Sequence, residues 1–384
     1  MFLTSLGLAT AVLIMEAMFQ MFFVTPLWNV LPMPEVSLYG PDAPTGYAHR
    51  PGTSGIWMTE NRSHVTISAQ GLRDRDRPAV PNGPRIVVVG NSMIEATQVA
   101  QGETAVAVAE KSLQRHTPGI EVLNLGLAGA TPAVEIARLF SRGTKLRADL
   151  ALVVVPLGDL LSAASRDDSG FTAYRQQVDG SYGLSYGFRE GRGFRFRTSA
   201  AGDAMYAALD HSFIATLLNN RKNIGFFAEF PSRPQAPSGD ARPQSTCQGA
   251  NLNAQARLWL TNEPADAAGV RDAFIRDLAA FQKSGTTVIV LVQGLNPRCE
   301  LNQRQKVMAR IIQRFAEAGL DATDLDAEIV RRVGASNIYA LHGFASSLGR
   351  GHLNVDGNKV YGAIFADVIR RSLSRMGSPA EPRT

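Results

Sequence analysis

The sequence predicts an α/β fold in which a mostly parallel sheet carries helices on both faces. Short uninterrupted runs rich in β-branched residues recur along the chain, which is typical of strands buried on both faces. Segments with helical spacing of apolar residues separate these runs, and strands that alternate with helices form βαβ units. Of the 384 residues, 45% are hydrophobic and 19% are charged, which excludes an intrinsically disordered chain.

Four buried strands and five main helices are predicted. The strands cover residues 85–92, 120–126, 148–158 and 286–294. The helices cover TAVAVAEKSLQRH, PAVEIARLFSRG, AAGVRDAFIRDLAAFQKSG, QRQKVMARIIQRFAEAG and VDGNKVYGAIFADVIRRSLSR. Sheets of this kind bind ligands at the carboxyl ends of their strands, so we expect a functional site at that edge.

The N-terminal segment, residues 1–34, is strongly apolar and contains one charged residue, Glu16. It exceeds the roughly 20 residues that a membrane-spanning helix needs, and Trp28 suits the interface near its end. Glu16 costs about 3 kcal/mol on insertion, which the surrounding apolar residues offset. We therefore expect an anchor that contacts a membrane through residues 1–28. A cleaved signal peptide fits less well, because no basic residue precedes the run, and a buried core helix is the third interpretation.

The rest of the chain divides by composition. Residues 35–83, rich in Pro, Gly and Arg, are predicted to be a linker and an extended lead-in. Residues 84–376 form the α/β domain, and residues 377–384 a disordered tail. An irregular insertion at about 161–262 interrupts the domain, and its DGS turn predicts a hairpin.

The insertion is rich in aromatic residues and arginine. Arginine pairs well with carboxylates, so this segment is a candidate site for an acidic glycan or an envelope protein, whereas a solvated, partly disordered loop is the alternative. Cys247 and Cys299 lie in polar, loop-like text. They form either a disulfide, which requires an oxidising compartment, or two free thiols.

Charge and metal-ligand spacing exclude other classes of function. The net charge is +5, yet the basic residues form no dense run, so nucleic-acid binding is not indicated. Six scattered histidines without a His-x-x-x-His pair, together with two cysteines, predict no metal site.

Three small or titratable residues lie where strands end or the last helix begins. Ser92 follows the first strand in Gly90-Asn91-Ser92, where a tight turn would expose its hydroxyl above the sheet; its alternative role is to cap a helix. Gly129 follows the second strand and could bring a backbone N–H to an oxyanion, or it serves an ordinary turn. His352 precedes the last helix and is otherwise a surface or capping histidine.

The blocks RIVVVGNSMIEATQV, IEVLNLGLAGATPAVEIARL, ADLALVVVPLGDLL and GHLNVDGNKVYGAIFADVI resemble the SGNH/GDSL hydrolase superfamily. The resemblance is strongest to bacterial envelope members that carry an N-terminal membrane segment. It implies a flavodoxin-like three-layer α/β/α sandwich with Ser92 as nucleophile, His352 as general base, and Ser92 and Gly129 as backbone oxyanion donors. Ester chemistry on a serine needs no cofactor, and none is expected.

Three positions depart from the family pattern. Asn91 replaces the usual aspartate beside the nucleophile, a mild change. Gly158 replaces the asparagine of the third block, so any oxyanion contribution there is restricted to the backbone. Gly349 stands where the fifth block has the aspartate that orients the histidine. Asp326 and Asp159 are the candidates to replace that acid.

Two hypotheses on function follow. The first is a serine esterase or acyl-ester transferase acting on an acylated, in particular an acetylated, cell-envelope glycan or lipid. The second, which rests on Gly158 and Gly349, is a catalytically weak or inactive module that binds or scaffolds an envelope polysaccharide assembly. The resemblance and the anchor imply a single-pass inner-membrane protein whose α/β domain lies in the periplasm.

Overall fold

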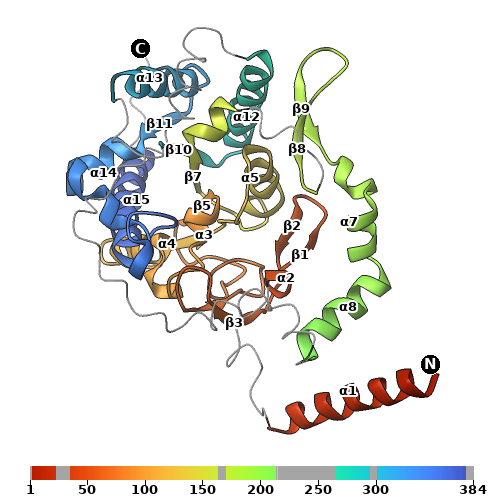
Figure 1. The fold of residues 1–384 in the computed structure, drawn as a ribbon. Helices are drawn as coiled ribbons and strands as arrows, with labels where there is room; N and C mark the ends of the chain where they lie inside the picture. The colour runs from red at the N-terminus through yellow and green to blue at the C-terminus, as the bar shows by residue number, and fades with distance from the viewer. Residues whose placement is uncertain are drawn as a thin grey trace, which may run out of the picture.

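The computed structural model describes residues 2–22, 35–162, 170–212, 214, 264–294 and 301–377. Its centre is a parallel sheet in the order β11-β10-β7-β5-β6 (Figure 1). The strands are β5 (Arg85–Gly90), β6 (Glu121–Asn124), β7 (Leu150–Pro156), β10 (Thr287–Gln293) and β11 (Asp321–Asp324). Numbered along the chain this order is 2-1-3-4-5, that of flavodoxin-like sheets. The predicted parallel α/β sheet is confirmed.

The fifth strand, β11, was not predicted. Its sequence, Asp-Ala-Thr-Asp, has no apolar run, and among the described strands it pairs with β10 alone, at the edge of the sheet. An edge strand exposes one side to water and therefore tolerates polar residues that a central strand does not.

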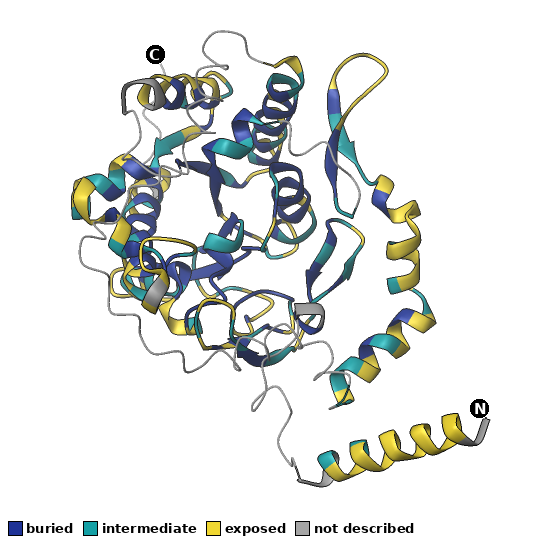
Figure 2. Ribbon diagram, in the orientation of Figure 1, coloured by how far each residue is buried: buried dark blue, intermediate teal, exposed yellow. Residues whose placement is uncertain are grey.

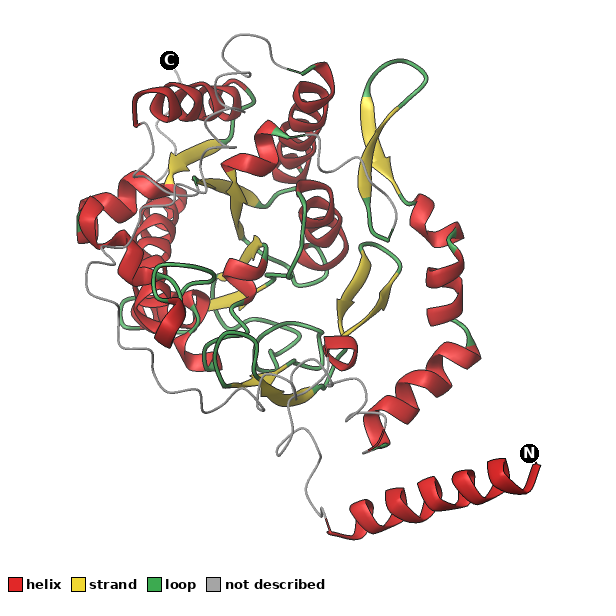
Figure 3. Ribbon diagram, viewed as in Figure 1, coloured by secondary structure: helices red, strands yellow, loops and turns green. Residues whose placement is uncertain are grey.

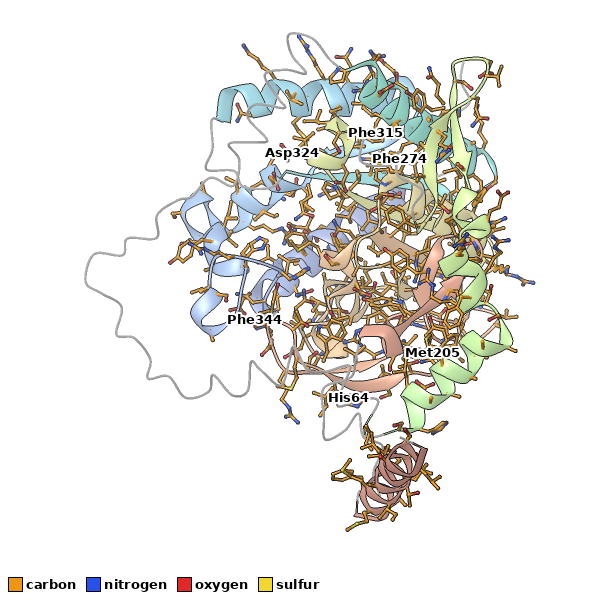
Figure 4. All side chains as sticks on the ribbon, turned by 45° about the vertical axis from the view of Figure 1, so that its right-hand side comes forward. His64, Met205, Phe274, Phe315, Asp324 and Phe344 are labelled. Atoms are coloured by element: carbon orange, nitrogen blue, oxygen red, sulfur yellow. The ribbon has the colours of Figure 1, made fainter. Side chains whose placement is uncertain are left out.

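Helices cover both faces of the sheet, which gives the predicted three layers (Figure 3). The elements of one face are α4 (Ala105–Gln114), α14 (Leu325–Val333) and α15 (Val355–Gly377), and those of the other are α5 (Pro132–Arg138), α12 (Ala265–Lys283) and α13 (Leu301–Glu317). Alternate strand residues point to opposite faces, so Ile86 and Val88 pack with the first group and Val87 and Val89 with the second. Figure 2 shows the central strands β5, β7 and β10 as the buried centre of the sheet. Phe274 and Phe315, labelled in Figure 4, belong to the core between the sheet and the helices α5, α12 and α13.

The N-terminal helix α1 (Phe2–Phe22) lies at the edge of the molecule, and most of its side chains are exposed (Figures 1 and 2). Glu16 Oε2 accepts hydrogen bonds from the Ile214 backbone N–H (3.0 Å) and the Ser212 hydroxyl (3.2 Å). Within the ranges given above, no helix combines the length and apolarity needed to cross a bilayer. The membrane-spanning helix predicted in residues 1–34 is therefore not supported.

Residues 35–83, predicted as a linker and lead-in, instead form two antiparallel hairpins. After the short helix α2 (Glu35–Leu38), β1 (Tyr39–Asp42) pairs with β2 (Gly46–His49), and β3 (Ser54–Trp57) pairs with β4 (Ser63–Thr66). Each strand has four residues, too few for a recognisable alternating pattern. Both hairpins pack against the side of the α/β domain (Figure 3).

The insertion begins with the predicted hairpin, β8 (Ala173–Gln176) and β9 (Tyr182–Ser185), whose turn contains Asp179-Gly180-Ser181. The hydroxyls of Tyr174 and Tyr182 donate to Asp277 (2.9 Å) and Asp266 (2.6 Å) and fasten it to α12. The helices that follow are η5 (Gly187–Glu190), α7 (Arg192–Arg197) and α8 (Ala200–His211). Residues 215–263, with Cys247, the segment around Cys299 and the tail 378–384 lie outside the described residues.

Candidate active site

The turn that carries Ser92 is built by the residues on either side of it. β5 ends at Gly90, where a Cβ atom would lie 2.5 Å from Ile94 Cγ1, so a larger residue would not fit. The side chain of Asn91 accepts the Met93 N–H (3.0 Å) and caps α3 (Ser92–Glu95). Ser92 thus starts a helix at the carboxyl end of β5, beside β7, where the strand order reverses and doubly wound sheets bind ligands.

His352 reaches Ser92 from the loop before α15. Its Nε2 atom lies 2.8 Å from Ser92 Oγ. A bridge between His342 and Leu353 holds the loop, and Asn354 caps the helix by accepting the Gly357 N–H (3.0 Å). The structure therefore brings together the two residues predicted as nucleophile and base.

Glu60 occupies the other side of the histidine ring. Its Oε1 atom lies 2.8 Å from His352 Nδ1, and its Oε2 atom accepts the backbone N–H of His352 (3.1 Å). An ionised carboxylate only accepts hydrogen bonds, so Nδ1 carries a proton and Nε2 presents its lone pair to the hydroxyl of Ser92. The side chains of His352 and Glu60 are 30% and 27% exposed, so reactants can reach them from solvent.

Glu60 is held at the tip of the β3–β4 hairpin. Its φ is +68°, a left-handed conformation that costs a non-glycine residue about 1 kcal/mol or more. The side chain of Asn61 donates to the Gln98 carbonyl (2.9 Å), and the hydroxyl of Ser63 donates to the Thr97 carbonyl. The tip is thereby tied to the loop that follows α3, close to Ser92.

The acids proposed from the sequence to orient His352 are not its partners. Glu60 holds Nδ1, and neither Asp326 nor Asp159 forms a hydrogen bond with His352 in the described part of the chain. Asp326 lies in the first turn of α14, and Asp159 lies in α6 (Leu157–Leu161), where burial raises its pKa to about 6. Gly349, at the family's usual acid position, has a φ of +87° in a turn.

Sequence reasoning missed Glu60 because nothing near it indicates a catalytic role. It precedes Ser92 in the chain, in a short polar turn, WMTENRS, outside the blocks that carry the resemblance. Only the docking of the β3–β4 hairpin brings it to His352. A left-handed glutamate is a signal for function, but it is visible only once the backbone is known.

The loop after β6 lies against α3. The side chain of Asn124 donates to the Ile94 carbonyl (2.8 Å), and the Leu127 N–H donates to the Gly90 carbonyl (3.0 Å). A Cβ at Gly126 would lie 2.2 Å from the Glu95 nitrogen, so only glycine permits this approach. The backbone N–H groups of Ser92 and Gly129 have no acceptor among the described residues.

Gly158, the third predicted oxyanion position, lies in α6 directly after β7. β7 neighbours β5, the strand that leads to Ser92. A role for the Gly158 backbone, like the oxyanion roles of Ser92 and Gly129, stays a prediction.

A second glutamate–histidine pair involves α3, the helix that begins with Ser92. Glu95, in α3, contacts His49 Nε2 and accepts the hydroxyl of Tyr39 (2.7 Å). The side chains of His49 and Glu95 are 0% and 1% exposed, and burial lowers the pKa of His49. This cluster fastens the β1–β2 hairpin to the helix that begins with Ser92.

A cavity of about 480 Å³ lies on the outer side of the β1–β2 hairpin, between that hairpin and the helices α7 and α8. The small residues Gly40 and Ala48 are among those that line it. The charged side chains that line it are Arg50, Arg142, Arg197, Asp42, Asp203 and Asp210. In the described part of the chain, no three His, Cys, Asp or Glu residues gather as metal ligands.

Comparison with known proteins finds only slight likenesses. No protein-family model matches the chain, and no curated protein matches it. An α/β hydrolase enzyme from the metagenome of Lake Arreo, Spain, has 14% identity and a TM-score of 0.36, over 78% of this chain and 99% of that one. An acetylxylan esterase from Geobacillus stearothermophilus has 13% identity and a TM-score of 0.36, over 80% and 100%. Likenesses this slight carry no argument, so the case for a function rests on the site itself.

Proposed function

We propose that this protein is a serine esterase or O-acyltransferase of the SGNH hydrolase type. The observation that carries the proposal is the unbroken chain from Glu60 through His352 to Ser92, with both hydrogen bonds at 2.8 Å. The alternative of an inactive binding module rested partly on the missing acid at Gly349. In our proposal Glu60, which lies 2.8 Å from His352 Nδ1, takes the role of that acid, and the alternative then loses this support.

The proposed reaction begins when Ser92 Oγ attacks an acyl carbonyl and His352 Nε2 takes the hydroxyl proton. The negative charge of Glu60 stabilises the imidazolium, and the N–H groups of Ser92 and Gly129 stabilise the tetrahedral oxyanion. Collapse breaks the ester bond, and His352 returns the proton to the leaving alcohol. Water or a sugar hydroxyl then attacks the acyl-serine by the same steps, which gives hydrolysis or transfer.

The test compares two serines that each contact a histidine. Ser54 Oγ lies 3.3 Å from His64 Nε2, outside the Glu60–His352–Ser92 chain, so Ser54→Ala is the matched control for Ser92→Ala. We expect Ser92→Ala to lower hydrolysis of 4-nitrophenyl acetate about 10³-fold or more and to abolish labelling by a serine-reactive phosphonate. Ser54→Ala should retain both. Equal activity in the two variants would overturn the proposal, and products formed with a glycan acceptor would separate hydrolysis from transfer.

We infer that the substrate is an acylated acidic glycan and that the cavity lined by Arg50, Arg142, Arg197 and three aspartates holds one of its carboxylates. Arg50 pairs with Asp210 and Arg142 with Asp42, but Arg197 donates only to the Gly193 carbonyl (3.3 Å) among the described residues. A guanidinium without a carboxylate partner at a cavity wall suits a carboxylated sugar.

Arg195 in the same helix is exposed and does not line the cavity, which makes it a matched control. Binding of an oligogalacturonate and of a neutral xylo-oligosaccharide to Ser92→Ala protein tests this inference without turnover. Arg197→Gln should weaken oligogalacturonate binding about tenfold, and Arg195→Gln should change it little. Equal losses, or equal binding of the neutral sugar, would contradict the cavity as the site.

We further propose that the protein works at the bacterial inner membrane, with the α/β domain on the periplasmic side. The support is the apolar exposed surface of α1, where Leu8 and Leu13 are each 69% exposed. Membrane fractionation of cells that express the full chain, or its Leu8→Lys or Leu13→Lys variant, tests this proposal. Membrane association that these variants do not reduce would count against the role of α1.

A further inference from the structure

The loop after β6 contains a turn that can exist in two forms. The Ala130 N–H donates to the Leu127 carbonyl (3.0 Å), which closes a four-residue turn with Ala128 and Gly129 at its centre. Gly129 has a φ of +71°, whereas Ala128 is not among the residues with positive φ. A negative φ followed by a positive one defines a type II turn, which favours glycine at the second central position.

The difference between turn types lies in the central peptide unit. Types I and II close with the same hydrogen bond, but the peptide between Ala128 and Gly129 is rotated by about half a turn between them. The described chain contains no cis peptide bonds, so the Ala128 carbonyl and the Gly129 N–H point in opposite directions from one plane. Any contact that holds this carbonyl therefore also fixes the direction of the Gly129 N–H.

One side chain holds the carbonyl. The hydroxyl of Tyr47, in β2, donates a hydrogen bond to the Ala128 carbonyl oxygen. The Tyr47 ring is itself placed by edge-to-face contacts with Tyr39 and Phe171, at centroid distances of 6.1 and 6.4 Å. His49, two residues along the same strand, fastens the hairpin to Glu95. The hydroxyl is thus presented from a hairpin tied to the nucleophile helix.

We propose that Tyr47 is a positioning residue for the oxyanion site. Its hydrogen bond selects the type II turn and directs the Gly129 N–H, which has no acceptor among the described residues, away from the tyrosine and toward the reacting carbonyl. In the flipped turn the Ala128 carbonyl oxygen would face an oxyanion and repel it. The inference rests on the proposed esterase function.

The test is Tyr47→Phe in the full chain, with Tyr39→Phe as control. Tyr39 belongs to the same hairpin and donates to Glu95 instead of the turn. We expect Tyr47→Phe to lower kcat about 10- to 100-fold with little change in KM. Loss of one oxyanion donor typically lowers the rate about 10²–10³-fold, and without the tyrosine hydroxyl only a fraction of the molecules should adopt the flipped turn. Affinity for a trifluoromethyl ketone, which forms a tetrahedral oxyanion on the serine, should fall by a similar factor. A lowered unfolding temperature or a raised KM would indicate a merely structural effect of the substitution.

Gly129→Ala is the second variant. Alanine disfavours a φ of +71°, and its Cβ would lie 3.2 Å from the Tyr47 hydroxyl oxygen, so the substitution disturbs the same turn and its contact with the tyrosine. Its kcat loss and that of Tyr47→Phe should not add in the double variant. A Tyr47→Phe kcat no lower than that of Tyr39→Phe, or a kcat loss with unchanged ketone affinity, would overturn the inference. If Ser92→Ala retained activity, the proposed function would fail; if Ser92→Ala were inactive and Tyr47→Phe normal, only the positioning role would fail.

Discussion

The described part of the chain contains two glutamate–histidine pairs that differ in burial and in their surroundings. Glu60 and His352 are about a quarter to a third exposed, and the second ring nitrogen of His352 meets Ser92. Glu95 and His49 are buried, and the second ring nitrogen of His49 has no hydrogen-bond partner among the described residues. The two pairs therefore differ in access to solvent and in whether a third group, Ser92, extends the chain of hydrogen bonds.

Burial also changes what each pair can do. Removal from water disfavours the charged imidazole, so the pKa of His49 is lowered and this histidine is held neutral. A histidine that must accept and return a proton cannot work under that constraint. The buried pair instead joins the β1–β2 hairpin to α3, and the exposed pair joins the β3–β4 hairpin to His352. Both hairpins of residues 35–83 thus reach the site through a glutamate contact.

The largest expected effect is on catalysis at the exposed pair. Glu60→Gln keeps the shape of the side chain but removes its charge and its preference for the Nδ1–H tautomer of His352. We expect kcat for 4-nitrophenyl acetate to fall about 10³- to 10⁴-fold, as replacement of a triad acid by its amide does. The free energy of unfolding, measured in urea, should change by less than about 1 kcal/mol because the pair is partly exposed. Activity within tenfold of the parent would show that Glu60 is not the orienting acid.

The buried pair should respond in the opposite way. His49→Phe leaves the Glu95 carboxylate buried with Tyr39 as its only described hydrogen-bond donor, so we expect the free energy of unfolding to fall by about 2–4 kcal/mol. Activity per folded molecule should fall much less than in Glu60→Gln. Urea titration and active-site counting with a phosphonate provide the two measurements. If His49→Phe were as stable as the parent but inactive, the buried pair would not have the purely structural role that we expect.

Asp159 extends the comparison, because it is a half-buried acid that forms no hydrogen bond with a histidine among the described residues. Burial raises its pKa from 3.8 to about 6, so the native state binds more protons than the unfolded state between these values. Stability must then fall as pH rises through this window, and the full cost persists above it. Asp159→Asn should be more stable than the parent by about 1–3 kcal/mol at pH 7.5 and by much less at pH 4. Thermal unfolding across this range measures it, and an equal effect at both pH values would exclude ionisation as the cause.

Local patterns were sufficient for the sheet and for part of the site. Four strands, the main helices and the first hairpin of the insertion lie close to their predicted positions, because buried β-branched runs and helical spacing leave a strong signature. Chain order places Ser92 and His352 at one edge of the sheet, and the resemblance to the SGNH/GDSL hydrolases implies their roles as nucleophile and base. The four-residue strands of residues 35–83 and the polar edge strand β11 have no such signature, and they were missed.

The sequence by itself determined which segments form the buried sheet and which hydroxyl and imidazole lie at its carboxyl edge, since both follow from periodicity and chain order. Only the tertiary structure decided which carboxylate is the partner of His352. Glu60 reaches His352 because a hairpin docks beside α3, and no local pattern encodes contacts between residues so far apart in the chain. The same docking separates the two glutamate–histidine pairs, since burial is a property of packing and not of residue type.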